Sequence, residues 1–398
     1  MRRKKKLSKP SEEDVDRRDA FIILNSLPDI GSLRINSLIT FFGSPEGVLK
    51  AGEKDLQQIA GIGPKIAATI AGWEENCDIE MEKQAAKRAD VTIITRDDQN
   101  YPALLHHIHD PPVCLYVRGD PAILSTTSSS VAMVGSRRIT NYGTKMADTL
   151  GTAAAVAGWP VVSGLARGID TCVHEAVVRM NGCAIAVLGS GLGRIYPQEN
   201  IGLARRITAK GAVVSEFPMT FAPMKRTFPM RNRIISGMTK GTVVIEAGHR
   251  SGSLITANMA LEQNRLVFAV PGRADSPQSR GCNQLIREGA TLTESFDDIL
   301  ENFSFLPGFN SISSSRDKED ETDDGGTHKQ TSQNTVQLTE LEQRILDVMD
   351  TDEVLIDNLV AEVGETIPKV FQALFSLEMK KFVRQLPGKR VVRVDGQG

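Results

Sequence analysis

Residue types that bind phosphate gather in the stretch 227–272. It contains Arg231 and Arg233, then the apolar run 243–245, and then 251–253 at the start of a helical pattern. The first N–H groups of a helix have no partner within the helix, so an anion can bind there without a catalytic group. Arginine adds a planar fork of donors that matches phosphate. The stretch therefore predicts a site for a phosphorylated ligand.

Three more loops, 134–138, 163–170 and 189–197, carry glycine, serine and arginine directly after candidate strands. Glycine lets a backbone approach a ligand closely, and the arginines supply donors. With 228–233, we expect four such loops to converge on one edge of a sheet. The candidate contacts in the first two loops are Gly135, Ser136, Arg137, Gly164, Arg167 and Gly168.

Other ligands are poorly supported. Glycines at 189, 191 and 193 suggest a dinucleotide fingerprint, but its third glycine would fall at Arg194, where a bulky side chain prevents close packing. The chain has no G-x-x-x-x-G-K-[ST] sequence, and its five cysteines have no C-x-x-C spacing. The cluster His106, His107, His109 and Asp110 does not place its rings on one helical face. We expect neither a cofactor nor a metal.

Acid-base groups are few at the predicted edge. Glu246 is the strongest candidate, although it could instead accept N–H bonds from its own loop or pair with Arg250. His249 follows the same strand, but no serine or cysteine nucleophile accompanies it. His174 lies in an apolar helical pattern and is expected to be an interior histidine with its hydrogen bonds satisfied.

The positioning elements are an alternation of strands and helices. Short strands among turns are expected at 91–94 and 114–117. After them the alternation becomes regular, with candidate strands at 131–135, 161–163, 184–189, 212–216, 242–246 and 266–270 separated by helices such as 142–157 and 169–180. This order predicts a doubly wound parallel sheet of the α/β class, which binds ligands at the carboxyl ends of its strands.

The N-terminal part is helical, and the segment 56–67 is typical of a helix-hairpin-helix. Gly61 and Gly63 permit a tight hairpin, Ile62 is expected to pack between the helices, and Pro64 suits a first helical turn. A looser copy lies at 27–31. Such hairpins either donate N–H groups to a DNA strand or serve only as packing units, and the sequence leaves both possibilities open.

The C-terminal part predicts helices at 338–349, 355–363 and 370–379 and a hairpin near 382–394, which resembles a winged helix. Few polar side chains on the third helix could reach base edges, which favours an accessory or protein-contact role.

The predicted regions are a basic tail 1–15, a helical domain 16–85, an α/β domain 86–306, a flexible acidic linker 307–336 and a winged-helix-like domain 337–398.

The numbers of basic and acidic residues are nearly equal. The net charge is -2, the basic start is followed by polar residues, and no apolar run reaches the length of a membrane span. We therefore expect a soluble cytoplasmic protein that does not contact membranes.

Taken together, the segments 135–137, 163–170, 191–197, 228–236, 251–254 and 268–272 closely resemble the bacterial DNA-processing protein A family (DprA, also called Smf). The resemblance runs from about 24 to 299. It implies an N-terminal helical domain of helix-hairpin-helix or SAM-like type, an extended Rossmann-like domain that forms homodimers, and a winged-helix C-terminus. The implied activity is to bind single-stranded DNA during natural transformation and to load the RecA recombinase onto it.

The family's DNA pocket maps onto residues that the loops had already suggested, with Lys225 and Phe228 added by the resemblance. Phe228 could stack on an unpaired base. The full predicted set is Gly135, Ser136, Arg137, Gly164, Arg167, Gly168, Lys225, Phe228, Arg231, Asn232 and Arg233.

Three hypotheses follow. The preferred one is a non-catalytic protein that binds single strands without sequence specificity, because arginines recur at strand ends and no nucleophile–base pair is present. An alternative is an enzyme similar to the nucleotide phosphoribohydrolases, with Glu246 beside a glycine-rich loop, although residues 246–253 depart from their P-G-G-x-G-T-x-x-E pattern. A third is a regulator that reads duplex DNA through 338–394.

Overall fold

The computed structural model describes residues 15–304, 340–349, 354–364, 382–386 and 390–393, together with the single residues 370, 373, 374 and 377. The chain divides into two compact units, Met1–Ile312 and Ser313–Gly398. The predicted tail 1–15, apart from residue 15, and the predicted linker 307–336 lie outside the described residues. No helix in the described ranges combines the length and apolar character needed to cross a membrane.

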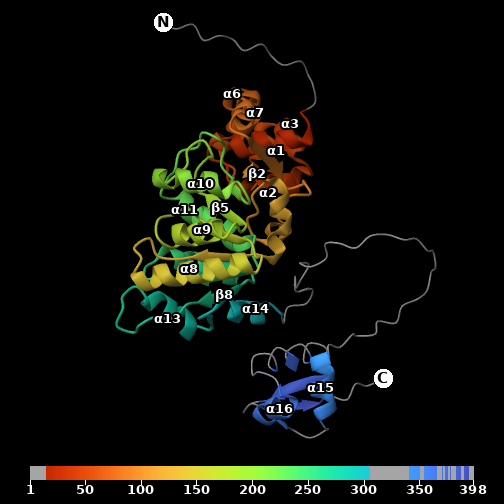
Figure 1. The fold of residues 1–398 in the computed structure, drawn as a ribbon. Helices are drawn as coiled ribbons and strands as arrows, with labels where there is room; N and C mark the ends of the chain where they lie inside the picture. The colour runs from red at the N-terminus through yellow and green to blue at the C-terminus, as the bar shows by residue number, and fades with distance from the viewer. Residues whose placement is uncertain are drawn as a thin grey trace, which may run out of the picture. The chain divides into compact units, whose positions relative to one another are not determined.

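Seven helices begin the larger unit and gather at one end of it, in red to orange in Figure 1. They are α1 Arg17–Ser26, α2 Ser32–Phe42, α3 Pro45–Lys50, α4 Glu53–Leu56, α5 Pro64–Ala71, α6 Trp73–Asn76 and α7 Ile79–Arg88. The predicted hairpin joins α4 to α5: Gly61 has a φ of 85°, Ile62 is buried and Pro64 occupies the first turn of α5. Between α1 and α2, Asp29 takes the same left-handed conformation.

A nine-stranded sheet forms the centre of the unit, in the order β1-β2-β6-β5-β4-β3-β7-β8-β9. The strands are β1 Val91–Thr95, β2 Cys114–Gly119, β3 Val131–Val134, β4 Val161–Ser163, β5 Ala184–Leu188, β6 Ala212–Ser215, β7 Gly241–Val244, β8 Leu266–Ala269 and β9 Thr291–Leu292. The predicted parallel sheet is confirmed from β6 to β9, whereas β1 and β2 add an antiparallel extension.

Helices pack on the sheet through two hydrophobic clusters. They are α8 Asn141–Val156, α9 Ile169–Arg179, α10 Ile201–Ile207, α11 Thr227–Gly237, α12 Gly252–Glu262, α13 Arg280–Arg287 and α14 Phe296–Ser304. Along β3, Val131 and Met133 belong to one cluster and Ala132 and Val134 to the other, because successive strand residues point to opposite faces. Both faces are therefore covered, as parallel sheets require.

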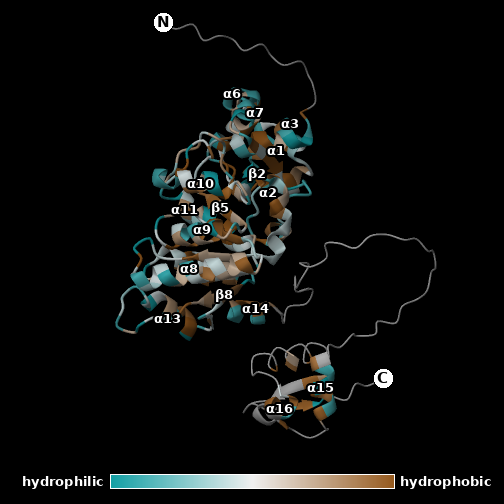
Figure 2. Cartoon of the chain, viewed as in Figure 1, coloured by the Kyte–Doolittle hydropathy of each residue, from teal (hydrophilic) through white to brown (hydrophobic). Residues whose placement is uncertain are grey.

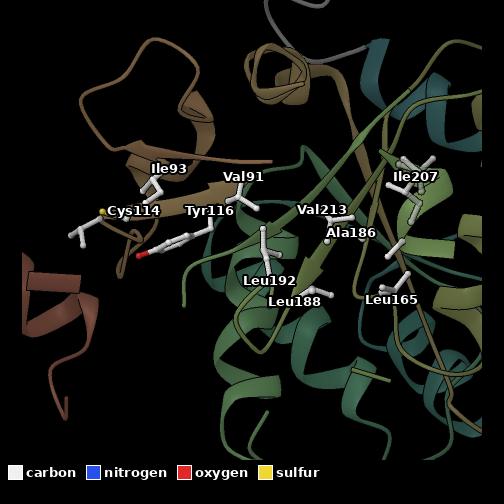
Figure 3. Close-up of a cluster of buried hydrophobic side chains, with 14 of the residues drawn as sticks. Val91, Ile93, Cys114, Tyr116, Leu165, Ala186, Leu188, Leu192, Ile207 and Val213 are labelled. Carbon is white, nitrogen blue, oxygen red and sulfur yellow. The ribbon is translucent and has the colours of Figure 1, made fainter. Parts of the chain in front are cut away.

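The antiparallel extension shares one of these clusters with the parallel strands. Figure 3 shows Tyr116 of β2 and Val91 of β1 in the same cluster as Val213 of β6 and Ala186 of β5. Fully burying an aliphatic side chain contributes about 1.5–3 kcal/mol. The hydrophilic colour in Figure 2 lies on peripheral helices such as α6 and α7, as expected for amphipathic surface helices.

The strand order reverses at β3. From β3 the chain adds β4, β5 and β6 on one side, then returns to place β7, β8 and β9 on the other side. At such a reversal the connections leave in opposite directions, so the carboxyl ends of β3 and β7 border an open crevice.

The second unit contains α15 Glu340–Val348, β10 Val354–Leu355, α16 Ile356–Val363, β11 Val383–Leu386 and β12 Arg390–Arg393, with the strand order β10-β12-β11. Ile345, Leu359 and Val391 lie in its core. The first two predicted helices and the hairpin are confirmed. The third, at 370–379, falls mostly outside the described residues.

The segment 228–233, predicted as a loop, forms the first turns of α11, where Arg233, which was predicted to contact DNA, pairs with carboxylates. Arg233 is buried, with its two Nη atoms 2.8 and 2.6 Å from the carboxylate oxygens of Glu216. It also donates to Asp110 and to Ser32 of α2. Burial alone would lower the pKa of Arg233, but the carboxylates outweigh burial and hold that pKa above its usual value.

Replacing Arg233 should test how strongly this network joins the helical region to the sheet. Arg233→Met leaves the Glu216 carboxylate buried without its partner, so we expect the free energy of unfolding to fall by about 3–5 kcal/mol. Trp73 and Trp159 both lie in the larger unit, so urea unfolding followed by tryptophan fluorescence reports this change.

The matched control is Arg179→Met, which breaks the exposed pair of Arg179 with Asp148. Exposed pairs contribute about 0–1 kcal/mol, so little change is expected. Equal effects of the two substitutions would contradict a stabilising role for the Arg233 network.

Candidate nucleic-acid interface

A pocket of about 960 Å³ opens at the strand-order reversal. Its walls come from the loops after β3, β4, β5 and β7, from the segment leading into α11 and from α11 itself. Of the predicted residues, Gly135, Ser136, Arg137, Lys225, Phe228, Arg231 and Asn232 line it. Gly164 and Arg167 line a smaller adjoining pocket of about 50 Å³, together with Arg137, Phe228 and Arg231.

The loop after β3 is held by its own hydrogen bonds. The Ser136 N–H donates to the Glu246 carbonyl at 2.7 Å, and the Ser136 hydroxyl donates to the Arg138 carbonyl at 2.7 Å. A Cβ at Gly135 would lie 2.5 Å from the side chain of Ile169, so only glycine fits there. The Ser136 hydroxyl was predicted to face a ligand, whereas here it shapes the loop.

The side chain of Arg137 lies beside two aromatic residues, Phe228 and Tyr196. Its guanidinium carbon lies 5.5 Å from the centre of the Phe228 ring, which is within the range of a cation–π contact. Phe228 lies 5.5 Å, centre to centre, from Tyr196, whose side chain is 42% exposed. Two aromatic rings and a cation thus adjoin in one wall of the pocket. Tyr196 lies in a loop that the sequence singled out, but it was not predicted as a contact.

Arg231 is only 3% exposed, and its Nε and Nη1 atoms have no hydrogen-bond partner among the described residues. Burial lowers its pKa to about 10, although the nearby Asp170 acts in the opposite direction. Burial also raises the pKa of Asp170, whose carboxylate accepts from the Gly164 and Ala166 N–H groups. Burial thus disfavours the charged forms of both Arg231 and Asp170. A bound anion beside Arg231 would favour its charged guanidinium.

Gly164 makes room for Arg231, because a Cβ at Gly164 would lie 1.5 Å from Nη1. Gly168 has a φ of 85°, and a Cβ there would lie 2.2 Å from the Ser136 carbonyl oxygen. Gly168 does not line either pocket and allows close packing against the Ser136 carbonyl. Arg167 is exposed and forms a double hydrogen bond with Glu199, at 2.5 and 2.7 Å.

The start of α12 also lines the larger pocket. Ser251 caps this helix by accepting from the Ser253 N–H, which leaves the positive end of α12 at the pocket. His249, Arg250, Gln278 and Arg280 also line this pocket and were not predicted. Arg280 lies after β8, outside the four loops that predicted the site, so the sequence pattern did not indicate it as a contact.

Of the three acid-base candidates, Glu246 and His174 lie away from the pocket lining, whereas His249 lines it. Glu246 is 3% exposed, and its carboxylate accepts from the Thr140 N–H at 3.3 Å and from the Thr140 hydroxyl. Both partners predicted for Glu246, its own loop and Arg250, are therefore wrong. His174 is interior as predicted, with its pKa lowered to about 3 by burial, but neither ring nitrogen has a partner among the described residues. In the same ranges, no cluster of three His, Cys, Asp or Glu could hold a metal.

Known proteins share this architecture. A family model described as DNA recombination-mediator protein A matches residues 92–304, and a DprA winged helix domain model matches residues 329–389. Protein Smf of Synechocystis is 32% identical over 380 residues, covering 92% of this chain and 96% of that protein. Protein Smf of Escherichia coli is 39% identical over 298 residues, covering 74% and 76%.

A solved structure agrees with these matches. The X-ray structure of DNA processing protein A (DprA) from Streptococcus pneumoniae has a TM-score of 0.63 and 33% sequence identity, and the match covers 72% of this chain and 99% of that one. The chain therefore belongs to the DprA/Smf family of DNA-processing recombination mediators.

Proposed function

We propose that the chain binds single-stranded DNA at the pocket after β3 and β7, without sequence specificity and without cutting it. The observation that carries the proposal is Arg231, a buried arginine in the pocket wall with two unpaired donor atoms. A buried polar group without a partner is costly, and a phosphate oxygen would supply the missing acceptor. Arg137, Lys225 and the positive end of α12 line the same pocket.

Preference for single strands follows from the aromatic surface. Phe228 and the exposed Tyr196 offer faces on which a base can stack, but only a base that is free of its own neighbours can use them. The pocket cations suit phosphates, which are the same in every sequence. Binding should therefore depend strongly on salt and weakly on base identity.

Binding without cleavage is part of the same proposal. Glu246 was the acid-base candidate of the hydrolase alternative, and its carboxylate is occupied by Thr140 rather than lining the pocket. A general base must reach the proton that it removes. This placement favours a structural use of Glu246 over a catalytic one.

We further propose that the bound strand is passed to the RecA recombinase in the cytoplasm during DNA uptake, by a homodimer formed through the Rossmann-like domain. The support is family membership, since a recombination mediator must act between a strand and a recombinase. A homodimer would bring two pockets to one strand, which raises the effective concentration of the second contact.

Arg137→Ala should weaken binding of a labelled oligonucleotide about tenfold or more, because a hydrogen bond to a charged group contributes about 1.5–3 kcal/mol. It should also reduce the slope of log affinity against log salt by about 0.7, the value for one phosphate of a single strand. Fluorescence anisotropy at several salt concentrations measures both quantities. Arg179→Ala, an exposed arginine of α9 outside the pocket, is the control. An unchanged slope in Arg137→Ala would argue against a phosphate contact.

Phe228→Ala should lower affinity by about 1–3 kcal/mol, because it removes a face on which a base can stack. Phe228→Trp keeps a stacking face and should retain binding. Phe41→Ala removes an exposed ring of α2 outside the pocket and should have no effect. The same anisotropy assay applies, and an effect of Phe41→Ala equal to that of Phe228→Ala would contradict a specific platform.

Loading of the recombinase can be measured as the lag before RecA hydrolyses ATP on a strand that single-strand-binding protein already covers. The intact chain should shorten this lag, and Arg137→Ala should not, because it holds the strand poorly. Tight strand binding with no change in the lag would refute the loading step while leaving strand binding intact.

A further inference from the structure

The loop that carries Arg137 is attached to the end of β7 at two points. At its start, the Ser136 N–H donates to the Glu246 carbonyl at 2.7 Å. At its end, the Thr140 N–H and hydroxyl donate to the Glu246 carboxylate. Both attachments use the same residue, one through its backbone and the other through its side chain. Arg137 lies between them.

The carboxylate occupies a site built for it. Thr140 is the N-cap of α8 and accepts from the Gly143 N–H, so Glu246 lies at the positive end of that helix. A Cβ at Gly143 would lie 2.6 Å from the Glu246 Oε2 atom, so the space beside the carboxylate requires glycine. Glu246 is 3% exposed, and a buried carboxylate without hydrogen bonds would be strongly disfavoured. The hydrogen bonds between Thr140 and the Glu246 carboxylate are thus stabilised by the helix N-terminus and by burial.

Fixing the loop limits what Arg137 can do before a ligand arrives. Between the attachments, the Ser136 hydroxyl closes a turn onto Arg138, and the Arg137 guanidinium rests against Phe228. A side chain that is already in its binding position loses less conformational entropy when it meets a phosphate. If the end of the loop were released, that advantage would be lost although every pocket-lining residue remained.

We propose that Glu246 is a positioning residue for strand binding, which acts by holding Arg137 in place. This inference rests on the proposed function. It also gives a role to the buried carboxylate that the hydrolase alternative would have used for catalysis.

A double-mutant cycle tests the inference on the intact chain, with anisotropy measured at several salt concentrations. Glu246→Ala should weaken binding of a labelled oligonucleotide about five- to tenfold and lower the salt slope. In an Arg137→Ala background, Glu246→Ala should change affinity less than twofold, because Arg137, through which Glu246 acts, has been removed. Glu246→Gln keeps an acceptor oxygen for Thr140 and should restore most of the affinity.

Two further variants guard against a general loss of structure. Gly143→Ala crowds the carboxylate without removing it and should reproduce the loss of affinity, which keeps the test valid if Glu246→Ala does not fold. Glu82→Ala is the matched control, since Glu82 is also buried and accepts a backbone N–H, from Met219, away from the pocket. It should lower the melting temperature and leave affinity and slope unchanged.

The outcomes are distinguishable. An equal loss of affinity for Glu246→Ala in the parent and the Arg137→Ala backgrounds would overturn the positioning role alone. So would a Glu246→Gln protein as weak as Glu246→Ala. If Arg137→Ala itself binds as tightly as the parent, the proposed function fails and the positioning role fails with it.

Discussion

The reversal of strand order at β3 is the constraint on which the rest of the structure depends. Parallel strands that are added in both directions from one strand must leave a gap between their connections, and here that gap lies between β3 and β7. The loop after β3 and the start of α12 both line the pocket at this gap. Backbone donors, arginines and an aromatic ring can then face one pocket although they are far apart in the sequence.

Burial divides the arginines of α11 into two roles. Arg231 and Arg233 are two residues apart on one helix, so they point about 200° apart around its axis. Arg233 points to carboxylates and joins the helical region to the sheet. Arg231 lies in the pocket wall with donors unsatisfied. The same residue type thus stabilises the fold at one position and keeps unpaired donors in the pocket wall at the other.

Much of this was predictable from the sequence. The apolar runs at 131–135 and 242–246 predicted strands of a parallel sheet, and the glycine, serine and arginine residues after them predicted a phosphate-binding edge. The exceptions depended on partners distant in the sequence. The pairing of Arg233 with Glu216 could not be predicted from the residues around Arg233. The same is true of the hydrogen bonds between Thr140 and Glu246. The segment 228–233 was predicted as a loop, although Pro229 suits the first turn of a helix, where it lies in α11.

The central claim is that the pocket holds the phosphates of an unpaired strand. The most direct measurement is a titration of the intact chain with single-stranded and duplex oligonucleotides of equal length at several salt concentrations. We predict tighter binding of the single strand, little dependence on base composition, and a log–log salt slope that corresponds to several phosphates. Equal affinity for the duplex, or an affinity for the single strand that does not change with salt, would contradict the account.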